Sequence, residues 1–478
     1  MIDLSTLKET LNDRAIAVMG LGKTGLSVIQ ACEAVGIPTL AWDDQQDRCA
    51  SALESGAEIV DLNTTSLENI AFLILAPGIP FQYPSPHPVV KRFQSEQIEV
   101  FCDIELFNKV KPSAKTIGIT GTNGKSTTTA LIGHILKEAG KDVAIGGNIG
   151  DAVLTLPDFL SDNPDHYYVF ELSSYQLDLC PHFSPKIAAL LNISPDHLER
   201  HGGLNGYIKA KQGIFNTAEQ GVIAVDDEHT QNIFKTLNEK KPDQFTPIST
   251  TKVFPDNLYI NDNCILIDNS KQGNRPILDL KELKQLSGRH NWQNIAVAYA
   301  ICDLVGISTD TIAEAIRSFP GLEHRQQCIA EQNNVLYIND SKATNDEAAS
   351  KALATFEHIY WIAGGLSKEG GFTQCQKHLS DVEHVFLIGQ DAPILAQWLE
   401  KNEKPYTMCG TLDIAVRTAH LKAQENQKFG HTILLSPACA SWDQFKNFEE
   451  RGDHFTKLVH DLTLQNDASL TDDLGADD

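Results

Sequence analysis

Short apolar runs rich in β-branched residues recur along the chain, and most end in glycine or a small polar residue before a stretch of helical periodicity. This alternation is typical of βαβ units, so the pattern predicts an α/β protein with mostly parallel sheets. The predicted strands fall into three groups along the sequence. These are 15–20, 39–44 and 71–78 in the first group, 115–121, 167–174, 187–194 and 221–227 in the second, and 335–341, 359–365, 384–389 and 432–441 in the third.

The three groups predict three domains, and a chain of 478 residues is too long for one domain of average size. The natural cuts lie near Lys111 and Gly321, each beside a proline or glycine. We therefore expect domains over residues 1–110, 111–320 and 321–478.

Two segments depart from the βαβ pattern. Val253–Ile277 is polar and hairpin-like, which predicts an antiparallel β insertion within the middle domain. The acidic tail from about residue 466 has no periodicity, so we expect it to be disordered.

Charge and composition narrow the class of protein. The 39 basic and 63 acidic residues give a net charge of −24, which opposes nonspecific binding to nucleic acid or anionic membranes. The start of the sequence lacks the features of a signal peptide, and no window of 18 apolar residues occurs, so we expect a soluble cytoplasmic protein. Ten cysteines without a C-x-x-C pair favour reduced thiols over disulfides or a zinc site.

The stretch GITGTNGKSTTTALIG, residues 118–133, indicates a phosphate-binding loop at the start of a helix. Backbone N–H groups of a glycine turn and of a helix N-terminus bind anions, while Lys125 would reach the outer phosphates and Ser126 could bind Mg²⁺. The spacing is not that of the Walker pattern, which requires a glycine where this chain has Ile119. The loop therefore predicts nucleotide binding but leaves the kind of nucleotide enzyme open.

A second glycine motif, GLGKTG at 20–25, follows the first predicted strand, and Asp43 ends the next one. A dinucleotide-binding fold places its glycine turn and its ribose-binding acid at these points. The motif is weak by itself, so nicotinamide binding, binding of another nucleotide diphosphate and a purely structural turn all remain open.

Polar side chains follow several other predicted strands, where open α/β sheets bind their ligands. Glu171 ends an apolar strand, where an unpaired carboxylate is costly, and a Mg²⁺ shared with Ser126 would offset that cost. The segment after the next strand carries a group of titratable side chains: Asp196, His197, His201, Lys209 and Lys211.

Three further segments suggest binding residues. Asn291 and Asn294 lie three apart on one face of a predicted helix, where they could read adenine edges, although N-capping is the more ordinary role for such residues. NDSKATN at 339–345 and SPACASWDQFKNFEERG at 436–452 are interpreted as binding loops. The second of these carries Ser441, Lys446 and Phe448 in a helix-like setting.

In their order these motifs resemble one family, the Mur ligases, which are ATP-dependent amide-forming enzymes of peptidoglycan synthesis. Residues 120–126 match the family's shorter phosphate loop T-G-T-N-G-K-[ST] at every position. FELSSYQLD, NISPDHLERHGG, NDSKATN and LSPACASWDQFKNFEERG look most like the members that join D-glutamate to UDP-N-acetylmuramoyl-L-alanine. The resemblance extends from about Ala15 to Leu458.

The resemblance implies a Rossmann-like N-terminal domain for the UDP substrate, a central P-loop ATPase-like domain, and a Rossmann-like C-terminal domain for glutamate. It also implies an acyl-phosphate intermediate, two Mg²⁺ ions, a monomer, and Lys125, His197 and Lys211 as catalytic residues. Lys211 matches a lysine that the family carries as a carbamate derived from CO₂. Lys209 lies two residues earlier, but the spacing after PDHLERHGG favours Lys211.

The remaining site residues follow from the same resemblance. The implied metal-binding residues are Ser126, Glu171, His197 and Lys211. The implied ATP-binding residues are Gly121, Thr122, Asn123, Gly124, Lys125, Ser126, Thr127, Asn291, Asn294, Arg325 and Asp340. The implied UDP-substrate residues are Gly22, Lys23, Thr24, Asp43 and Asn148, and the implied glutamate residues are Lys342, Thr344, Lys368, Ser441 and Phe448.

One pair departs from the family pattern. Where well-known relatives have a Thr-Arg-like pair after the strand that ends at Asp43, this chain has Asp44 and Gln45, so we expect uridine recognition to differ in detail. Three other functions stay open at this point. They are a sister ligase (another Mur enzyme, a folate polyglutamate ligase or an L-glutamate-specific variant), an NAD-dependent oxidoreductase, and a nonenzymatic nucleotide-binding regulator.

Overall fold

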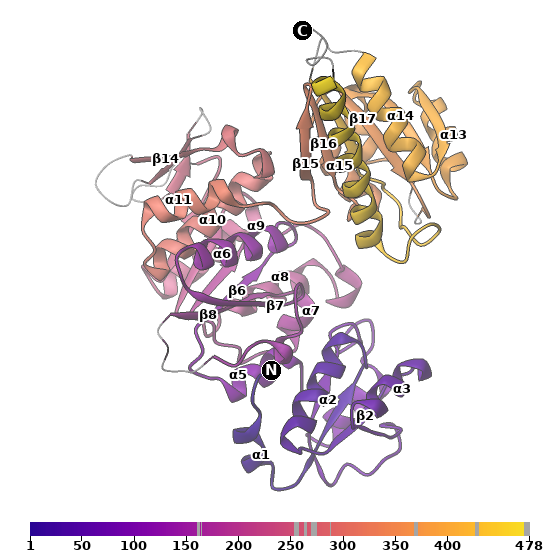
Figure 1. Ribbon diagram of the computed structural model, residues 1–478. Coiled ribbons are helices and arrows are strands. Elements are labelled where there is room, and N and C mark those ends of the chain that lie inside the picture. Colours follow the sequence, from indigo (N-terminus) through magenta and orange to yellow (C-terminus); the bar gives the residue numbers. More distant parts are fainter. Residues whose placement is uncertain are drawn as a thin grey trace. The chain divides into compact units, whose positions relative to one another are not determined.

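The computed structural model describes residues 1–159, 163, 165–252, 258–261, 265–268, 275–286, 288–367, 371–425 and 430–472; the side chains of 284, 289, 290 and 465–472 are outside that description. The chain divides into two compact units, whose elements are labelled in Figure 1. Unit one comprises Met1–Lys281 and Arg289–Ser318, and unit two comprises Glu282–Gly288 and Phe319–Asp478.

The first sheet of unit one is parallel, with strand order β3-β2-β1-β4-β5. Its strands are β1 (Ala15–Met19), β2 (Thr39–Trp42), β3 (Glu58–Ile59), β4 (Ile70–Leu75) and β5 (Val100–Phe101). The accompanying helices are α1 (Ser5–Leu11), α2 (Lys23–Val35), α3 (Gln46–Glu54), α4 (Pro88–Ser95) and α5 (Asp103–Val110). The chain leaves β1 toward β2 on one side and returns to β4 on the other, so a topological switch point lies at the carboxyl ends of β1 and β4.

The second sheet of unit one is also parallel, with order β11-β10-β9-β6-β8-β7. Its strands are β6 (Thr116–Thr120), β7 (Asp142–Gly147), β8 (His166–Glu171), β9 (Ile187–Leu190), β10 (Gln220–Ala224) and β11 (Phe245–Ile248). Its helical elements are α6 (Lys125–Glu138), α7 (Ser174–Asp178), α8 (Leu204–Gln212), α9 (Glu228–Lys240), α10 (Arg289–Val305), α11 (Thr309–Ser318), η1 (Val153–Thr155), η2 (Leu198–Arg200) and η3 (Gly213–Phe215). Because β6 lies between β8 and β9, the segments that follow these three strands share one edge of the sheet.

The predicted antiparallel insertion is confirmed over its described residues. Strands β12 (Leu258–Ile260), β13 (Ile265–Asp268) and β14 (Arg275–Asp279) pair antiparallel in a small sheet, followed by η4 (Leu280–Glu282) and η5 (Lys284–Leu286).

The described strands of unit two form a sheet of order β15-β16-β20-β17-β18-β19, in which the edge strand β15 is antiparallel to its neighbour and the other described pairs are parallel. The strands are β15 (Gln327–Gln332), β16 (Val335–Asn339), β17 (Ile359–Gly364), β18 (Val382–Ile388), β19 (Tyr406–Gly410) and β20 (His431–Leu435). The helical elements are α12 (Asp346–Leu353), α13 (Ala392–Lys401), α14 (Leu412–Glu425), α15 (Phe448–Asp472) and η6 (Cys375–Asp381). Buried residues of α12 and α13 form one core layer, and those of α14 and α15 form another, so helices cover both faces of the sheet.

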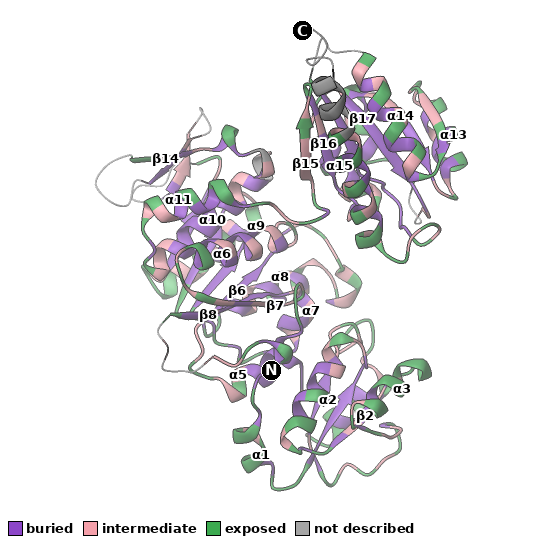
Figure 2. Ribbon diagram, in the orientation of Figure 1, coloured by how far each residue is buried: buried purple, intermediate pink, exposed green. Residues whose placement is uncertain are grey.

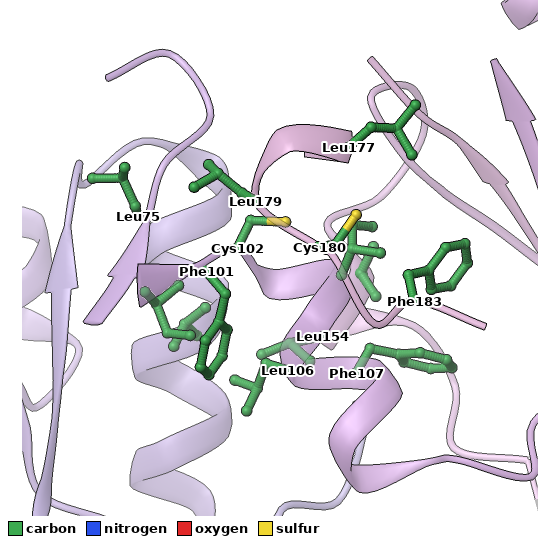
Figure 3. Packing of buried hydrophobic residues seen from close by; sticks show 14 of the residues in the cluster. Leu75, Phe101, Cys102, Leu106, Phe107, Leu154, Leu177, Leu179, Cys180 and Phe183 are labelled. Carbon is green, nitrogen blue, oxygen red and sulfur yellow. The ribbon is translucent and has the colours of Figure 1, made fainter. Parts of the chain in front are cut away.

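One continuous apolar core joins the first and second sheets of unit one. Figure 3 shows part of this core, where Cys102 lies beside Leu179, and Phe107 lies on the side of Phe183. The central strands are buried along their whole length, whereas the outer faces of the helices are exposed (Figure 2). The described cysteines are all free thiols, and all except Cys49 and Cys328 are buried.

The α/β class and its three main sheets are confirmed, whereas the division into three domains stays a prediction because the first two sheets share a core. The expectation for the tail is corrected in part, since α15 continues through Asp472, past the point where disorder was expected; residues 473–478 lie outside the described residues. None of the described helices combines the length and apolar character that crossing a membrane requires.

Candidate active site

The phosphate loop, Gly121–Gly124, connects β6 to α6 at the carboxyl edge of the second sheet. The helix begins at Lys125, as the sequence predicted. Gly124 has φ +83°, and a Cβ atom there would lie 2.3 Å from Oδ1 of Asn294 in α10. Both the backbone conformation and the close approach of α10 therefore require glycine at this position.

Side chains of the loop and of the first residue of α6 form hydrogen bonds with the loop backbone or with residues outside the loop. The Lys125 Nζ donates to the carbonyl oxygens of Gly121 and Thr122 at 3.0 and 2.8 Å. The Thr122 hydroxyl accepts a 3.0 Å hydrogen bond from the Ser194 amide and lies 3.0 Å from the Tyr207 hydroxyl. These bonds hold the lysine ammonium over the loop, where a bound phosphate chain would meet it.

Asn192 braces the phosphate loop from the segment after β9. Its Oδ1 accepts a 2.8 Å hydrogen bond from the Asn123 amide, and its Nδ2 donates to the Asn123 carbonyl oxygen at 3.2 Å. The same Nδ2 lies 3.3 Å from Oε1 of Gln293, whose Nε2 donates to Asp226 at 2.9 Å. Through these side chains, α10 and the segment after β10 hold the backbone of Asn123 within the loop in place.

Lys211 lies on α8 with only 1% of its surface exposed, and its Nζ donates a 2.7 Å hydrogen bond to the carbonyl oxygen of Gly121. Burial and, to a smaller extent, repulsion from Lys125 lower its pKa to about 7, against the attraction of Asp196 and Glu171. Lys209 is exposed on the same helix. Of the two candidate lysines, Lys211 therefore lies at the phosphate loop.

Glu171 is the last residue of β8 and is 1% exposed. Its Oε1 accepts a 2.7 Å hydrogen bond from Nδ2 of Asn148, but its buried Oε2 has no hydrogen-bond partner among the described residues. Ser126 is buried in the first turn of α6, at the same edge of the sheet. An unpartnered buried carboxylate oxygen at this edge fits a cation ligand.

No three His, Cys, Asp or Glu side chains converge as a metal cluster in the part of the chain that the structure describes. This does not count against Mg²⁺, since Mg²⁺ in nucleotide enzymes is commonly held by one or two carboxylates together with water and phosphate oxygens. The donor set of Glu171 and Ser126 beside a phosphate loop fits that mode of binding.

His197 opens the turn η2 in the left-handed conformation, with φ +51°. Its ring packs against Tyr175 of α7, with centroids 5.1 Å apart, and half of its side chain is exposed. His201 differs, because its buried ring lies 2.9 Å from both the Ser174 hydroxyl and the Asp178 carboxylate. His197 is therefore accessible to a ligand, whereas both ring nitrogens of His201 are already engaged.

The glycine loop, Gly20–Gly25, lies at the switch point of the first sheet. Asp43, directly after β2, accepts a 2.7 Å hydrogen bond from the Leu21 amide within this loop. Lys23 donates to the Gly150 carbonyl oxygen at 2.6 Å, next to Asp151. Gly22 has open space around its Cβ position, and Thr24 lies in the first turn of α2.

Asn291 and Asn294 are both buried in α10, and Nδ2 of Asn294 donates to Oδ1 of Asn291 at 3.1 Å. Because α10 begins at Arg289, the N-capping role considered for Asn291 is wrong. Asn294 instead packs against Gly124 of the phosphate loop.

In unit two, Asp340 follows β16 and is buried, and burial raises the pKa of its carboxyl to about 7. Its Oδ2 accepts a 2.7 Å hydrogen bond from Ser436, and its Oδ1 accepts a 3.2 Å bond from the Gln326 amide. These two bonds and the positive charge of Arg325 lower the pKa and so oppose the effect of burial in part. Arg325 and Asp340 thus lie together within unit two.

The residues expected around glutamate come from two loops of unit two. Lys342 Nζ lies 4.8 Å from the centroid of the Phe448 ring, Thr344 donates its amide to the Lys342 carbonyl oxygen, and Ser441 is buried. Lys368 lies outside the described residues. The helix-like setting expected for Ser441 and Lys446 is wrong, since α15 begins only at Phe448, where Oδ1 of Asn447 accepts a 2.8 Å capping bond from the Glu450 amide.

Two family models match the chain. A Mur ligase middle domain matches residues 119–302, and a Mur ligase glutamate ligase domain matches residues 324–439. The chain is 42% identical over 452 residues to the UDP-N-acetylmuramoylalanine–D-glutamate ligase of Paramagnetospirillum magneticum, covering 94% of this chain and 97% of that protein. It is 43% identical over 456 residues to the protein of the same name in Rhodospirillum rubrum, covering 94% of each.

The chain belongs to the Mur ligase family. Solved structures of other Mur ligases share the fold. A UDP-N-acetylmuramate-alanine ligase from Thermotoga maritima has a TM-score of 0.57 at 18% identity, covering 94% of this chain and 99% of that one. The UDP-N-acetylmuramoylalanyl-D-glutamyl-2,6-diaminopimelate–D-alanyl-D-alanyl ligase from Acinetobacter baumannii has a TM-score of 0.58 at 16% identity, covering 96% and 98%.

Sequence reasoning missed a buried arginine of this Mur ligase. Arg451 of α15 is 1% exposed and donates to the carbonyl oxygen and hydroxyl of Ser341 at 2.8 and 3.0 Å, and to the carbonyl oxygen of Cys439 at 3.2 Å. It therefore ties the loop after β16 to the loop after β20. The one signal in the sequence is its place among the apolar positions Phe448, Phe455 and Leu458 of the same helix.

Proposed function

We propose that this Mur ligase joins D-glutamate to UDP-N-acetylmuramoyl-L-alanine with ATP hydrolysis to ADP and phosphate, in the synthesis of peptidoglycan precursors. The names and the 42–43% identity of its relatives support this choice within the family. The observation that carries the chemistry is the convergence of Lys125, Lys211 and Glu171 at the phosphate loop.

The reaction needs ATP because a carboxylate is a poor electrophile. An oxygen of the alanyl carboxylate attacks the γ-phosphorus of ATP, which forms an acyl phosphate and releases ADP. The neutral amine of glutamate then attacks the acyl carbon, and the bond from that carbon to the phosphate-bearing oxygen breaks. The products are the amide and inorganic phosphate, and the amine loses one proton.

Positioned cations are needed because the triphosphate and the carboxylate repel each other. Lys125 lies over the phosphate loop and would bind the outer phosphates. Ser126, Glu171, His197 and a carbamylated Lys211 would hold two Mg²⁺ ions, which would neutralise phosphate charge as it shifts toward ADP. The unpartnered Oε2 of Glu171 supports this assignment.

Carbamylation of Lys211 is supported by its surroundings. Only a neutral amine can attack CO₂, and burial brings the pKa of Lys211 to about 7. The reaction forms an N–C bond and releases one proton, which turns a cationic side chain into an anionic oxygen ligand suited to Mg²⁺. The ammonium of Lys211 beside Lys125 is thereby replaced by a carbamate.

Substrate assignments complete the proposal. Asn291, Asn294, Arg325 and Asp340 would hold the adenosine, and Gly22, Lys23, Thr24, Asp43 and Asn148 would hold the UDP substrate. Lys342, Thr344, Lys368, Ser441 and Phe448 would surround glutamate. Domains over 1–110, 111–320 and 321–478, and a monomeric enzyme, are part of the same proposal.

Phosphate release tests this function. Purified protein with Mg²⁺, ATP and UDP-N-acetylmuramoyl-L-alanine should release phosphate with D-glutamate and not with L-glutamate. Activity only with L-glutamate, with folate, or with meso-diaminopimelate would assign a sister ligase instead. A change in NAD(P)H fluorescence without any dependence on ATP would favour the oxidoreductase.

A further inference from the structure

Arg200, at the end of η2, reaches from the second sheet to the turn that follows β4 of the first sheet. Its guanidinium donates to the carbonyl oxygens of Pro77, Gly78 and Ile79 at 3.3, 2.8 and 3.0 Å. Three consecutive carbonyl oxygens on one guanidinium make a specific contact, since the planar fork of arginine offers several donors in fixed directions. Arg200 therefore fixes the backbone of this turn, Ala76–Ile79, called the β4 turn below.

The β4 turn packs directly on the glycine loop. A Cβ atom on Gly20 would lie 2.5 Å from Cβ of Ala76 and 2.9 Å from Cδ1 of Ile79. The two segments follow β1 and β4, between which the strand order of the first sheet reverses, and ligands of open α/β sheets bind at this point. A change in the β4 turn would therefore change the shape of the predicted UDP site.

Two glycines indicate where a ligand would approach. Gly22 and Gly78 have no heavy atom within 4 Å of their Cβ positions, and neither has a positive φ. Among the described residues, neither packing nor backbone conformation therefore requires glycine at these two points. Close approach of a ligand to the backbone is a remaining reason for it.

A second contact joins the same two segments. The ring of Tyr83, beyond the β4 turn, packs on Gly202, where a Cβ atom would lie 2.7 Å from Cζ of the ring. Gly202 has φ +66° and lies two residues after Arg200. The contact of Arg200 is thus part of a packed junction rather than an isolated surface bond.

Arg200 also contacts the Tyr175 ring, which packs against His197, a proposed metal ligand. Its guanidinium carbon lies 4.5 Å from the centroid of the Tyr175 ring, a cation–π contact. Tyr175 packs in turn on His197 at 5.1 Å and stacks on the buried His201 at 5.7 Å. One side chain therefore connects the β4 turn to the segment that carries His197.

We propose that Arg200 is a positioning residue for the UDP substrate, which holds the β4 turn against the glycine loop and in register with the His197 segment. This inference rests on the proposed function, because it takes a UDP-linked substrate as the ligand of the first sheet. Arg200 itself would touch no reacting atom; it would act through the backbone of the β4 turn.

The test compares Arg200→Ala and Arg200→Lys with Arg92→Ala. Arg92 of α4 is also half-buried, and its guanidinium donates to two carbonyl oxygens, those of Leu62 and Thr65, in the segment after β3. Each variant is assayed for KM of UDP-N-acetylmuramoyl-L-alanine, KM of ATP, kcat and thermal unfolding. Binding of the UDP substrate alone is measured by calorimetry.

Arg200→Ala should raise KM and the dissociation constant of the UDP substrate by about tenfold or more, while KM of ATP stays within about twofold. Arg200→Lys should restore little of the affinity for the UDP substrate, because one ammonium lacks the planar fork of donors that bonds to three carbonyl oxygens. Arg92→Ala should lower the unfolding temperature without changing KM. Equal, purely thermal effects of Arg200→Ala and Arg92→Ala would overturn the inference, whereas a wild-type enzyme that neither binds nor uses the UDP substrate would overturn the proposed function.

Discussion

The Nζ of Lys211 donates a 2.7 Å hydrogen bond to the carbonyl oxygen of Gly121, the first glycine of the phosphate loop. The two residues are 90 positions apart in sequence, and the contact joins α8 to the turn that would surround the phosphates of ATP. Burial and the nearby Lys125 lower the pKa of this amine to about 7, which makes Lys211 a candidate for a chemical role at the loop.

Substitution of Lys211 should abolish turnover without abolishing ATP binding. Lys211→Ala removes the proposed carbamate ligand but leaves Lys125 and the loop amides, so turnover should fall on the order of a hundredfold or more while ATP still binds. Steady-state phosphate release and equilibrium nucleotide binding measure the two effects.

Lys209 supplies the matched control, because it is exposed on the same helix two residues earlier. Lys209→Ala should keep full activity. With ¹³C-labelled bicarbonate, a carbamate carbon resonance is expected in the wild type and in Lys209→Ala and not in Lys211→Ala. An active Lys211→Ala enzyme would show that the carbamate assignment is wrong.

Glu171 should set the requirement for Mg²⁺. Glu171→Gln keeps an oxygen for the bond from Asn148 but removes the charge from the unpartnered position. We expect the Mg²⁺ concentration for half-maximal turnover to rise about tenfold or more. Electron paramagnetic resonance of bound Mn²⁺, in the presence of a nonhydrolysable ATP analogue, gives a readout independent of turnover.

Glu199→Gln is the control for this experiment, since Glu199 is an exposed carboxylate in the neighbouring turn η2. Its Mg²⁺ dependence should match the wild type. If both variants respond alike, the effect is one of general surface charge and Glu171 is not a metal ligand.

Gly124 and Asn294 should be coupled energetically. Gly124→Ala introduces a Cβ atom 2.3 Å from Oδ1 of Asn294 and strains a backbone with φ +83°. Asn294→Ala removes the collision but not the strain, so the double variant should lose less stability than the sum of the single variants, by about 1 kcal/mol. Denaturant unfolding of all four proteins measures this, and simple additivity would mean that α10 does not contact the loop.

Asp340 should give the ligand-free protein a specific pH dependence. Its folded pKa of about 7 lies above the ordinary value of 3.8, so between these values the folded state keeps a proton that the unfolded state has lost. This contribution to the free energy of unfolding is therefore complete below pH 4 and is lost as the pH rises to about 7.

Asp340→Asn cannot ionise and should lack this loss. The stability of the wild type relative to the variant should fall between pH 4 and pH 7 and stay level above pH 8. Denaturant unfolding at several pH values measures the difference, and a difference that does not change with pH would show that the carboxyl of Asp340 titrates normally.

Much of the fold and part of the site could be predicted from the sequence. The buried parallel strands can be predicted from the sequence because they are continuous apolar runs, as in β1 and β6. The phosphate loop can be predicted because the positions of its glycines fix its shape. The burial of Lys211 could not be predicted from the sequence, because it depends on which face of α8 packs against the phosphate loop.

Arg200 and Arg451 were missed for a different reason. Both bind main-chain carbonyl oxygens far away in sequence, 122 positions for Arg200 and Gly78 and 110 for Arg451 and Ser341. Carbonyl oxygens are present at every residue, so no residue type marks such a partner. The start of α15 was misplaced because a capping bond from the Glu450 amide to Asn447, rather than the apolar pattern, determines it.

Transfer of ¹⁸O from the substrate carboxylate to phosphate tests acyl-phosphate formation most directly. UDP-N-acetylmuramoyl-L-alanine labelled in both carboxylate oxygens is turned over with ATP and D-glutamate, and the products are analysed by mass spectrometry. One ¹⁸O in the released phosphate and one in the new amide are predicted, because the bridging oxygen leaves with the phosphate. Unlabelled phosphate with both labels retained in the UDP-linked molecule would contradict the mechanism.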